Sequence, residues 1–189
     1  MNKEFNELLN NALENKVFPG CNIGIVKMDD DAEFHKYFYS VGKKALFPKE
    51  EDNDIDTIYD MASCSKVLAT TTAIMMLIQR GKLRLYDTVK TYLKDFSHDD
   101  ITVWDLLTHT SGLPEMLPGA HNMNKEEIIN GILNLPLKVE KNTKIMYSDA
   151  GFVLLGLIVE SISGEALDVF VKKNIFDVLD MKDSCYNPS

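Results

Sequence analysis

The sequence predicts an α/β domain of the α+β kind, in which a short antiparallel hairpin precedes a mostly helical part. Two stretches rich in β-branched and aromatic residues, 21–28 and 34–41, flank an acidic turn and are typical of a hairpin. Two helical stretches, 67–78 and 152–162, are apolar nearly all round, which is typical of buried core helices. After residue 62 the periodicity favours helices only.

Residues 1–62 are expected to form the first part of the domain. Apolar residues recur at helical spacing over residues 3–16, which predicts an amphipathic surface helix. The hairpin follows, and its acidic turn lacks the pattern of a calcium-binding loop. A polar and acidic connection over 43–57 then leads into a predicted short strand at 58–62.

Residues 63–189 are expected to form the helical part. Its first helix starts at Ser63 and stops at Gly81, a residue favoured after a helix C-terminus. Thr102 opens another helix with capping-box spacing, and Asn124 opens a third. The later helices are predicted over 152–162 and 166–179.

Composition limits the classes of function. The chain has 189 residues, of which 45% are hydrophobic and 26% charged, as in an ordinary globular protein. Its net charge of −9 argues against nucleic acid and anionic membranes as partners. The N-terminal residues lack the apolar core of a signal peptide, and the longest apolar run is too short to span a bilayer. Three cysteines without metal-ligand spacing argue against a metal site and favour a cytoplasmic location, the alternative being an export leader that has been removed.

The segment Ser63-Cys64-Ser65-Lys66 is the strongest candidate for chemistry. Residues three apart lie on one helix face, so the Lys66 amine can approach the Ser63 hydroxyl. A serine becomes nucleophilic when a nearby base takes its proton, and burial at the start of an apolar helix is expected to lower the pKa of Lys66 enough for that role. The alternative is that Ser63 only caps the helix.

His109 and Ser111 invite a second pairing of a serine with a histidine. The Gly112-Leu113-Pro114 run marks this stretch as the turn after a helix, and catalytic triads are recognised by geometry and not by adjacency. The sequence therefore favours a structural turn over a direct catalytic role for His109.

Taken in order, four blocks of the sequence resemble the serine β-lactamase and penicillin-binding protein superfamily. Its nearest branch contains class C β-lactamases, D-alanyl-D-alanine carboxypeptidases and related esterases. Residues 17–186 are similar, in order, to the N-terminal part of that family. The blocks are Ile58–Lys66, Leu83-Arg84-Leu85-Tyr86-Asp87, Leu106–Pro114, and Tyr147-Ser148-Asp149 followed by Gly151-Phe152.

The resemblance implies a β-lactamase/transpeptidase-like fold and a role for each matching residue. Ser63 would be the acylated nucleophile, Lys66 its activating base, and Tyr147 a second proton carrier. Asp149 stands where the family usually has Asn, and it would contact the substrate. An ionised Asp can only accept hydrogen bonds, which favours an ester or small peptide over a classical β-lactam. Asp149 could equally be a helix N-cap.

The family's third motif, Lys-Thr-Gly or His-Thr-Gly, is absent from these residues. In the family that motif lies on a later strand that completes the sheet, so we expect this chain to correspond to an N-terminal half that lacks the C-terminal strands. Its exposed sheet edge favours self-association.

The predicted function is a serine hydrolase that acts on a small acyl substrate through an acyl-enzyme on Ser63, weakly or not at all in this chain by itself, and without a cofactor. The alternative is a non-catalytic penicillin-binding sensor or an interaction half-domain that needs a partner chain.

Overall fold

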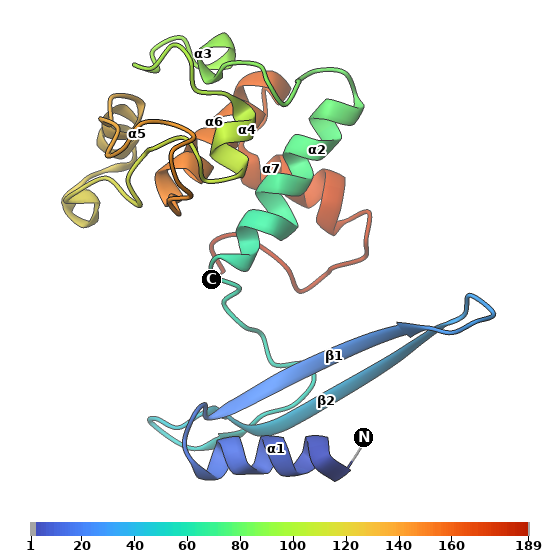
Figure 1. Cartoon of the computed structure of the whole chain (residues 1–189). Coiled ribbons are helices and arrows are strands. Elements are labelled where there is room, and N and C mark those ends of the chain that lie inside the picture. The colour runs from blue at the N-terminus through green and yellow to red at the C-terminus, as the bar shows by residue number, and fades with distance from the viewer. Residues whose placement is uncertain (1–2, 189) are drawn as a thin grey trace. The chain divides into compact units, whose positions relative to one another are not determined.

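A computed structural model describes residues 3–188 and divides the chain into two compact units, Met1–Asp60 and Met61–Ser189 (Figure 1). The first unit contains a helix and strands, and the second is helical. The sequence places this boundary between residues 62 and 63. The predicted α+β class is confirmed.

The first unit is a long hairpin with a helix lying along it (Figure 1). Strand β1 (Gly20–Met28) pairs antiparallel with β2 (Phe34–Ala45), with Cys21 opposite Val41. Helix α1 (Lys3–Glu14) contacts β2, where the Phe5 ring meets the Tyr39 ring edge to face at a centroid distance of 6.2 Å. The predicted hairpin and the predicted first helix are therefore both present.

The strand predicted at 58–62 is wrong. The third strand is instead β3 (Glu51–Asp52), which pairs with the end of β2 and gives the sheet order β1-β2-β3. The chain after β3 is held by side chains. Asn53 donates to the Cys21 carbonyl at 3.0 Å and accepts the Tyr59 hydroxyl at 3.0 Å. Side-chain hydrogen bonds therefore hold this segment in place of strand pairing.

The hairpin carries apolar side chains that the described residues leave exposed. They are Ile25, Val26, Met28, Phe34, Tyr37 and Phe38. Apolar strands with open edges favour pairing with another chain. Self-association through this hairpin stays a prediction.

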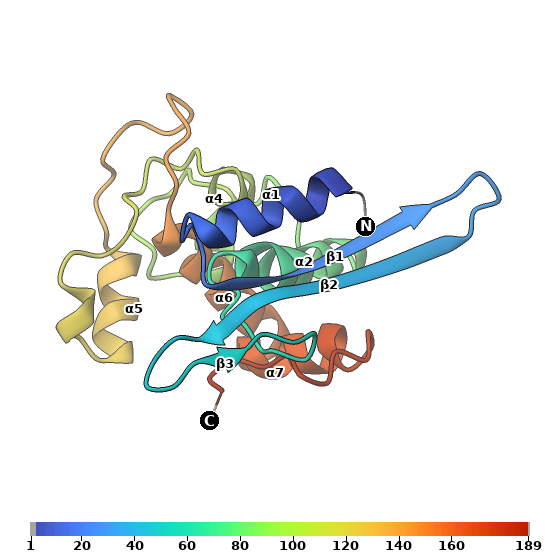
Figure 2. The same ribbon diagram turned by 90° about the horizontal axis from the view of Figure 1, so that it is seen from below.

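Helix α6 (Asp149–Ser163) is the centre of the second unit (Figure 2). It packs against the helices around it, and Leu154, Leu155 and Ile158 on it are fully buried. Its prediction as a core helix is confirmed. The helices around it are α2 (Thr72–Gln79), α3 (Val89–Tyr92), α4 (Val103–Leu107), α5 (Lys125–Leu133) and α7 (Leu167–Val171).

The helix that follows Ser63 begins as a π-helix, η1 (Lys66–Thr71), and continues as α2. One face is buried through Ala69, Ala73 and Ile74, whereas Val67 and Met75 on other faces are exposed. The prediction that this helix is buried all round is therefore right for one face only. A π-helical turn is rare and is frequently found at functional sites.

Short helical turns complete the second unit. They are η2 (Ala120–Asn122) and η3 (Lys172–Phe176), the second of which extends α7. Among the described residues no single helix is long and apolar enough to cross a membrane. By length and composition alone, one pair bent by 75° passes that test, namely α6 with Leu167–Phe176.

Gly112 is required by the backbone, which generates a test of the fold. Its φ is +81°, and a Cβ there would lie 2.1 Å from the Val139 carbonyl oxygen. Gly81 is a matched control, because its φ is +66° but a Cβ would meet nothing within 4 Å. Either Ala would be strained by its left-handed backbone conformation, but only in Gly112→Ala would the new Cβ also clash with the Val139 carbonyl oxygen. We expect Gly112→Ala to lower the free energy of unfolding by about 1–3 kcal/mol more than Gly81→Ala.

Urea denaturation of both variants measures this difference. Equal losses in the two variants would contradict the close approach of Gly112 to Val139.

Candidate active site

Ser63 lies in the turn that leads into η1. The Lys66 N–H donates to the Ser63 carbonyl at 3.1 Å, a bond between residues three apart as in a 3₁₀-helical turn. Lys66 therefore lies one turn beyond Ser63, and its Nζ donates to Ser63 Oγ at 3.1 Å. The sequence predicted this approach from the spacing of three residues.

Tyr147 reaches the same hydroxyl from a distant part of the chain. Its hydroxyl donates to Ser63 Oγ at 2.6 Å. Asp149, two residues later, places Oδ1 2.6 Å from Lys66 Nζ. The second unit thus brings together all four residues that the sequence singled out.

The Lys66–Asp149 contact is a close ion pair. Asp149 Oδ1 is buried against the Lys66 amine, and both their close polar contact and their opposite charges favour the charged lysine. The Lys66 side chain is 17% exposed and that of Asp149 is 36% exposed. The carboxylate therefore neutralises a lysine that is largely removed from water.

The expectation of a lowered pKa for Lys66 is wrong. Burial does lower the pKa of Lys66, but the close contacts and charge attraction of Asp149 and Tyr147 outweigh it, so this pKa lies above its ordinary value. The sequence argument considered burial alone. It could not include a carboxylate that lies 83 residues further along the chain and 2.6 Å away in space.

Aromatic rings form one wall around the lysine. Lys66 Nζ lies 5.1 Å from the centroid of the Tyr147 ring and 5.8 Å from that of Phe152. Both distances are within the range of a cation–π attraction, which favours the charged amine.

The loop over residues 109–115 holds the segment that carries Tyr147 and Asp149. The Asp149 N–H donates to the Glu115 carbonyl at 2.7 Å, and Ser148 Oγ donates to the Pro114 carbonyl at 2.7 Å. Ser148 Oγ also accepts the Gly151 N–H at 3.0 Å and is the N-cap of α6. The alternative that Asp149 caps this helix is therefore wrong, which leaves its carboxylate available to Lys66.

His109 also contacts this segment. Its Nδ1 accepts the Ser148 N–H at 3.0 Å, and its ring lies 4.6 Å from the Tyr147 ring, centroid to centroid. Ser111 is buried, and its Oγ accepts the Leu113 N–H. The sequence indicated a turn here but gave no role to His109. Its nearness to Tyr147 has no signal in the spacing, because 38 residues separate the two.

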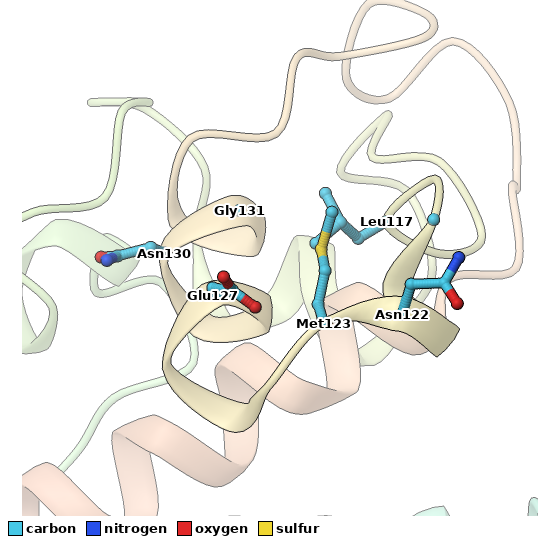
Figure 3. Close-up of a pocket in the computed structure, with 7 residues that line it drawn as sticks. Leu117, Asn122, Met123, Glu127, Asn130 and Gly131 are labelled. Atoms are coloured by element: carbon cyan, nitrogen blue, oxygen red, sulfur yellow. The ribbon is translucent and has the colours of Figure 1, made fainter.

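The second unit has two open grooves away from Ser63. One, of about 660 Å³, is lined by Leu117, Gly119, Asn122, Met123, Glu127, Asn130 and Gly131 (Figure 3). The other, of about 670 Å³, is lined by residues that include Pro114, Leu117, Pro136 and Lys138. Neither is lined by Ser63, Lys66 or Tyr147, so neither is part of the candidate active site.

The hairpin turn groups Asp29, Glu33 and His35, whose possible ligand atoms lie within 4.8 Å of one another. Asp29 Oδ1 already accepts the N–H groups of Asp31 and Glu33, and Oδ2 contacts His35 at 2.9 Å. These bonds explain the cluster as the closure of an acidic turn.

Comparison with known proteins gives the family of the chain. Residues 5–189 match the beta-lactamase family. An N-acetylmuramyl-L-alanine amidase of Bacillus subtilis is 33% identical over 90% of this chain and 43% of its own length. A putative D-alanyl-D-alanine carboxypeptidase of Escherichia coli O157:H7 is 29% identical over 90% of this chain and 44% of its own.

A solved structure gives the same result for the fold. The octameric penicillin-binding protein homologue from Pyrococcus abyssi superimposes with a TM-score of 0.76 and 26% identity, over 94% of this chain and 43% of that one. The chain thus spans less than half the length of the relatives that it matches here. It is a partial homologue of these proteins.

The ion pair makes stability depend on pH. A lysine whose folded pKa exceeds its unfolded value stabilises the fold fully below that unfolded value, ordinarily 10.5, and this contribution is lost as pH rises through the folded pKa. Asp149→Asn keeps the shape and removes the charge. We expect wild type to exceed Asp149→Asn in stability by on the order of 1 kcal/mol at about pH 8, because both groups stay partly solvated. The difference should shrink above about pH 10.5.

Urea denaturation at about pH 8 and pH 11.5 measures this difference. Asp99→Asn serves as the control, since Asp99 forms an exposed ion pair with Lys90 and should show no measurable change. A gap for Asp149→Asn that stays constant at high pH would rule out Lys66 as its source.

Proposed function

Because the chain belongs to the beta-lactamase family, we propose that Ser63 is the nucleophile of a serine hydrolase that works through an acyl-enzyme. The observation that carries this proposal is the pair of contacts on Ser63 Oγ, at 3.1 Å from Lys66 Nζ and 2.6 Å from the Tyr147 hydroxyl. A serine with two proton-carrying groups at hydrogen-bond distance has the arrangement that nucleophilic catalysis needs.

The proposed reaction has two steps. Ser63 Oγ attacks the substrate carbonyl carbon, its proton passes to the neighbouring base, and the leaving amine or alcohol departs with a proton. Water then attacks the resulting ester, releases the acid and restores the Ser63 hydroxyl. The names of the relatives, an amidase and a carboxypeptidase, favour an acyl–nitrogen bond as the one that is cut.

Lys66 and Tyr147 divide the proton transfer in this proposal. Lys66 can accept the Ser63 proton only after losing its own, and the raised pKa makes that form scarce near neutral pH. Tyr147 contacts the same oxygen and can pass a proton between Ser63 and the leaving group. Acylation should therefore become faster with rising pH, up to the pKa of Lys66.

Mass spectrometry after labelling with a penicillin or an activated ester tests the proposal. The label should appear on the peptide that contains Ser63 and disappear in Ser63→Ala. Label on Cys64 or Ser65 would overturn the assignment. Slow or absent release of the label would favour the alternative of a penicillin-binding sensor, because a hydrolase regains free Ser63.

The role of Lys66 as a base has its own test. Lys66→Arg keeps a positive charge but cannot lose a proton in the accessible pH range. If Lys66 is the base, Arg should slow Ser63 acylation about as much as Ala, on the order of 10²–10⁴. Stopped-flow labelling of the three proteins measures the rates. An Arg variant close to wild type would mean that Lys66 supplies only charge.

Asp149 is proposed to set the pH dependence of Ser63 acylation and the preference of the site for neutral over anionic substrates. Asp149→Asn removes the carboxylate that raises the pKa of Lys66, so more Lys66 is neutral at about pH 8. The neutral fraction of Lys66 rises about tenfold for each unit by which its pKa falls, but the amine also becomes a weaker base. We therefore expect faster acylation by a neutral ester, by less than about tenfold for each unit. A penicillin, which carries a carboxylate, should gain more because repulsion by Asp149 is also removed.

The comparison of the two substrates separates these effects. If acylation by the ester and by the penicillin increases by the same factor, the substitution acts only through the pKa of Lys66. A slower reaction with both substrates would show that Asp149 assists acylation, contrary to the proposal.

A further inference from the structure

His109 contacts the backbone on both sides of Tyr147. Its Nδ1 accepts the Ser148 N–H at 3.0 Å, and its carbonyl accepts the Met146 N–H at 2.7 Å. Its ring also lies against the Tyr147 ring, with an interplanar angle of 33°. We infer that His109 is a positioning residue that holds the Tyr147 hydroxyl on Ser63 Oγ; the inference rests on the proposed acylation of Ser63.

The bond to Ser148 fixes the chemical form of the imidazole. The donor is a backbone N–H, so Nδ1 must present a lone pair, and the proton of the neutral ring is on Nε2. A ring protonated at Nδ1 would turn a donor toward a donor. His109 can therefore hold this segment only while it is neutral.

The surroundings of His109 keep it neutral. Burial lowers the pKa of His109, and the Lys66 cation on η1 lowers it further, whereas Asp149 on α6 acts in the opposite direction. The His109 ring also packs against the aromatic rings of Tyr147 and Phe152. A histidine that must remain neutral is suited to positioning and poorly suited to carrying protons.

The backbone of His109 narrows the choice of replacement. Its φ is +57°, in the left-handed region, which Asn tolerates better than most residues. In Asn the side-chain oxygen is three bonds from Cα, as Nδ1 is in His, and that oxygen can accept the Ser148 N–H. Gln carries the same amide one carbon further out, so His109→Gln tests the reach of the acceptor. His109→Gly, which adopts a positive φ freely but has no acceptor, separates that effect from backbone strain and is expected to be as slow as His109→Gln.

Loss of the His109 acceptor would leave the Ser148 N–H without this hydrogen bond. Ser148 is 1% exposed, and its N–H would be left buried without this partner. Such a group is costly enough to displace the segment, and Tyr147 would move off Ser63 with it. We expect Ser63 acylation in His109→Ala and His109→Gln to be at least about tenfold slower than in wild type, and in His109→Asn to stay within about threefold.

The experiment measures three quantities on this chain and its variants. They are the rate of Ser63 labelling by an activated ester, amide hydrogen exchange at Ser148, and the nitrogen chemical shifts of the imidazole. We expect a neutral ring protonated on Nε2 at about pH 7, and faster Ser148 exchange in the Gln and Ala variants but not in Asn. Circular dichroism checks that each variant is folded.

Several results would overturn the inference. They are an Asn variant as slow as Gln, an Ala variant as fast as wild type, or a ring protonated on Nδ1 in wild type. If wild type takes no label at all, acylation of Ser63 in this chain is contradicted, and this result is independent of the role of His109. The exchange and chemical-shift results then still decide whether His109 holds the segment around Tyr147.

Discussion

The hydrogen bonds between the 109–115 loop and the start of α6 are the constraint on which the site depends. The first N–H groups of a helix have no partner within the helix and must find one elsewhere. Here the Ser148 side chain satisfies Gly151, and the Glu115 carbonyl accepts the N–H groups of Asp149 and Ala150. The start of the core helix is thereby fixed to a loop that is itself fixed by Gly112.

This arrangement explains how a core helix can present reactive groups. Leu154, Leu155, Ile158 and Val159 of α6 are fully buried, which gives the helix one position in the second unit. Tyr147 and Asp149, at the start of this helix, are only partly buried, and they reach Ser63 and Lys66 respectively. Packing therefore sets the geometry of the site, and the polar contacts complete it.

Charge balance is the second property of the site. A largely buried lysine without a counter-ion would be expected to lose its proton, whereas one beside a carboxylate keeps it. Asp149 occupies the position at which the resemblance implies Asn, and so it converts a potential free base into half of an ion pair. The same residue thus links the stability of the second unit to its chemistry.

The sequence by itself determined most of the helices, the hairpin and the candidate residues of the site. The helix that starts after Thr102, the one that starts after Asn124, and the core helix around 152–162 follow from capping residues and apolar periodicity, which are local properties. The approach of Lys66 to Ser63 follows from their spacing on one turn. Only the tertiary structure decided the protonation of Lys66, the cap of α6 and the position of His109. Each depends on atoms that are distant in the chain and adjacent in space, and no local pattern encodes such contacts.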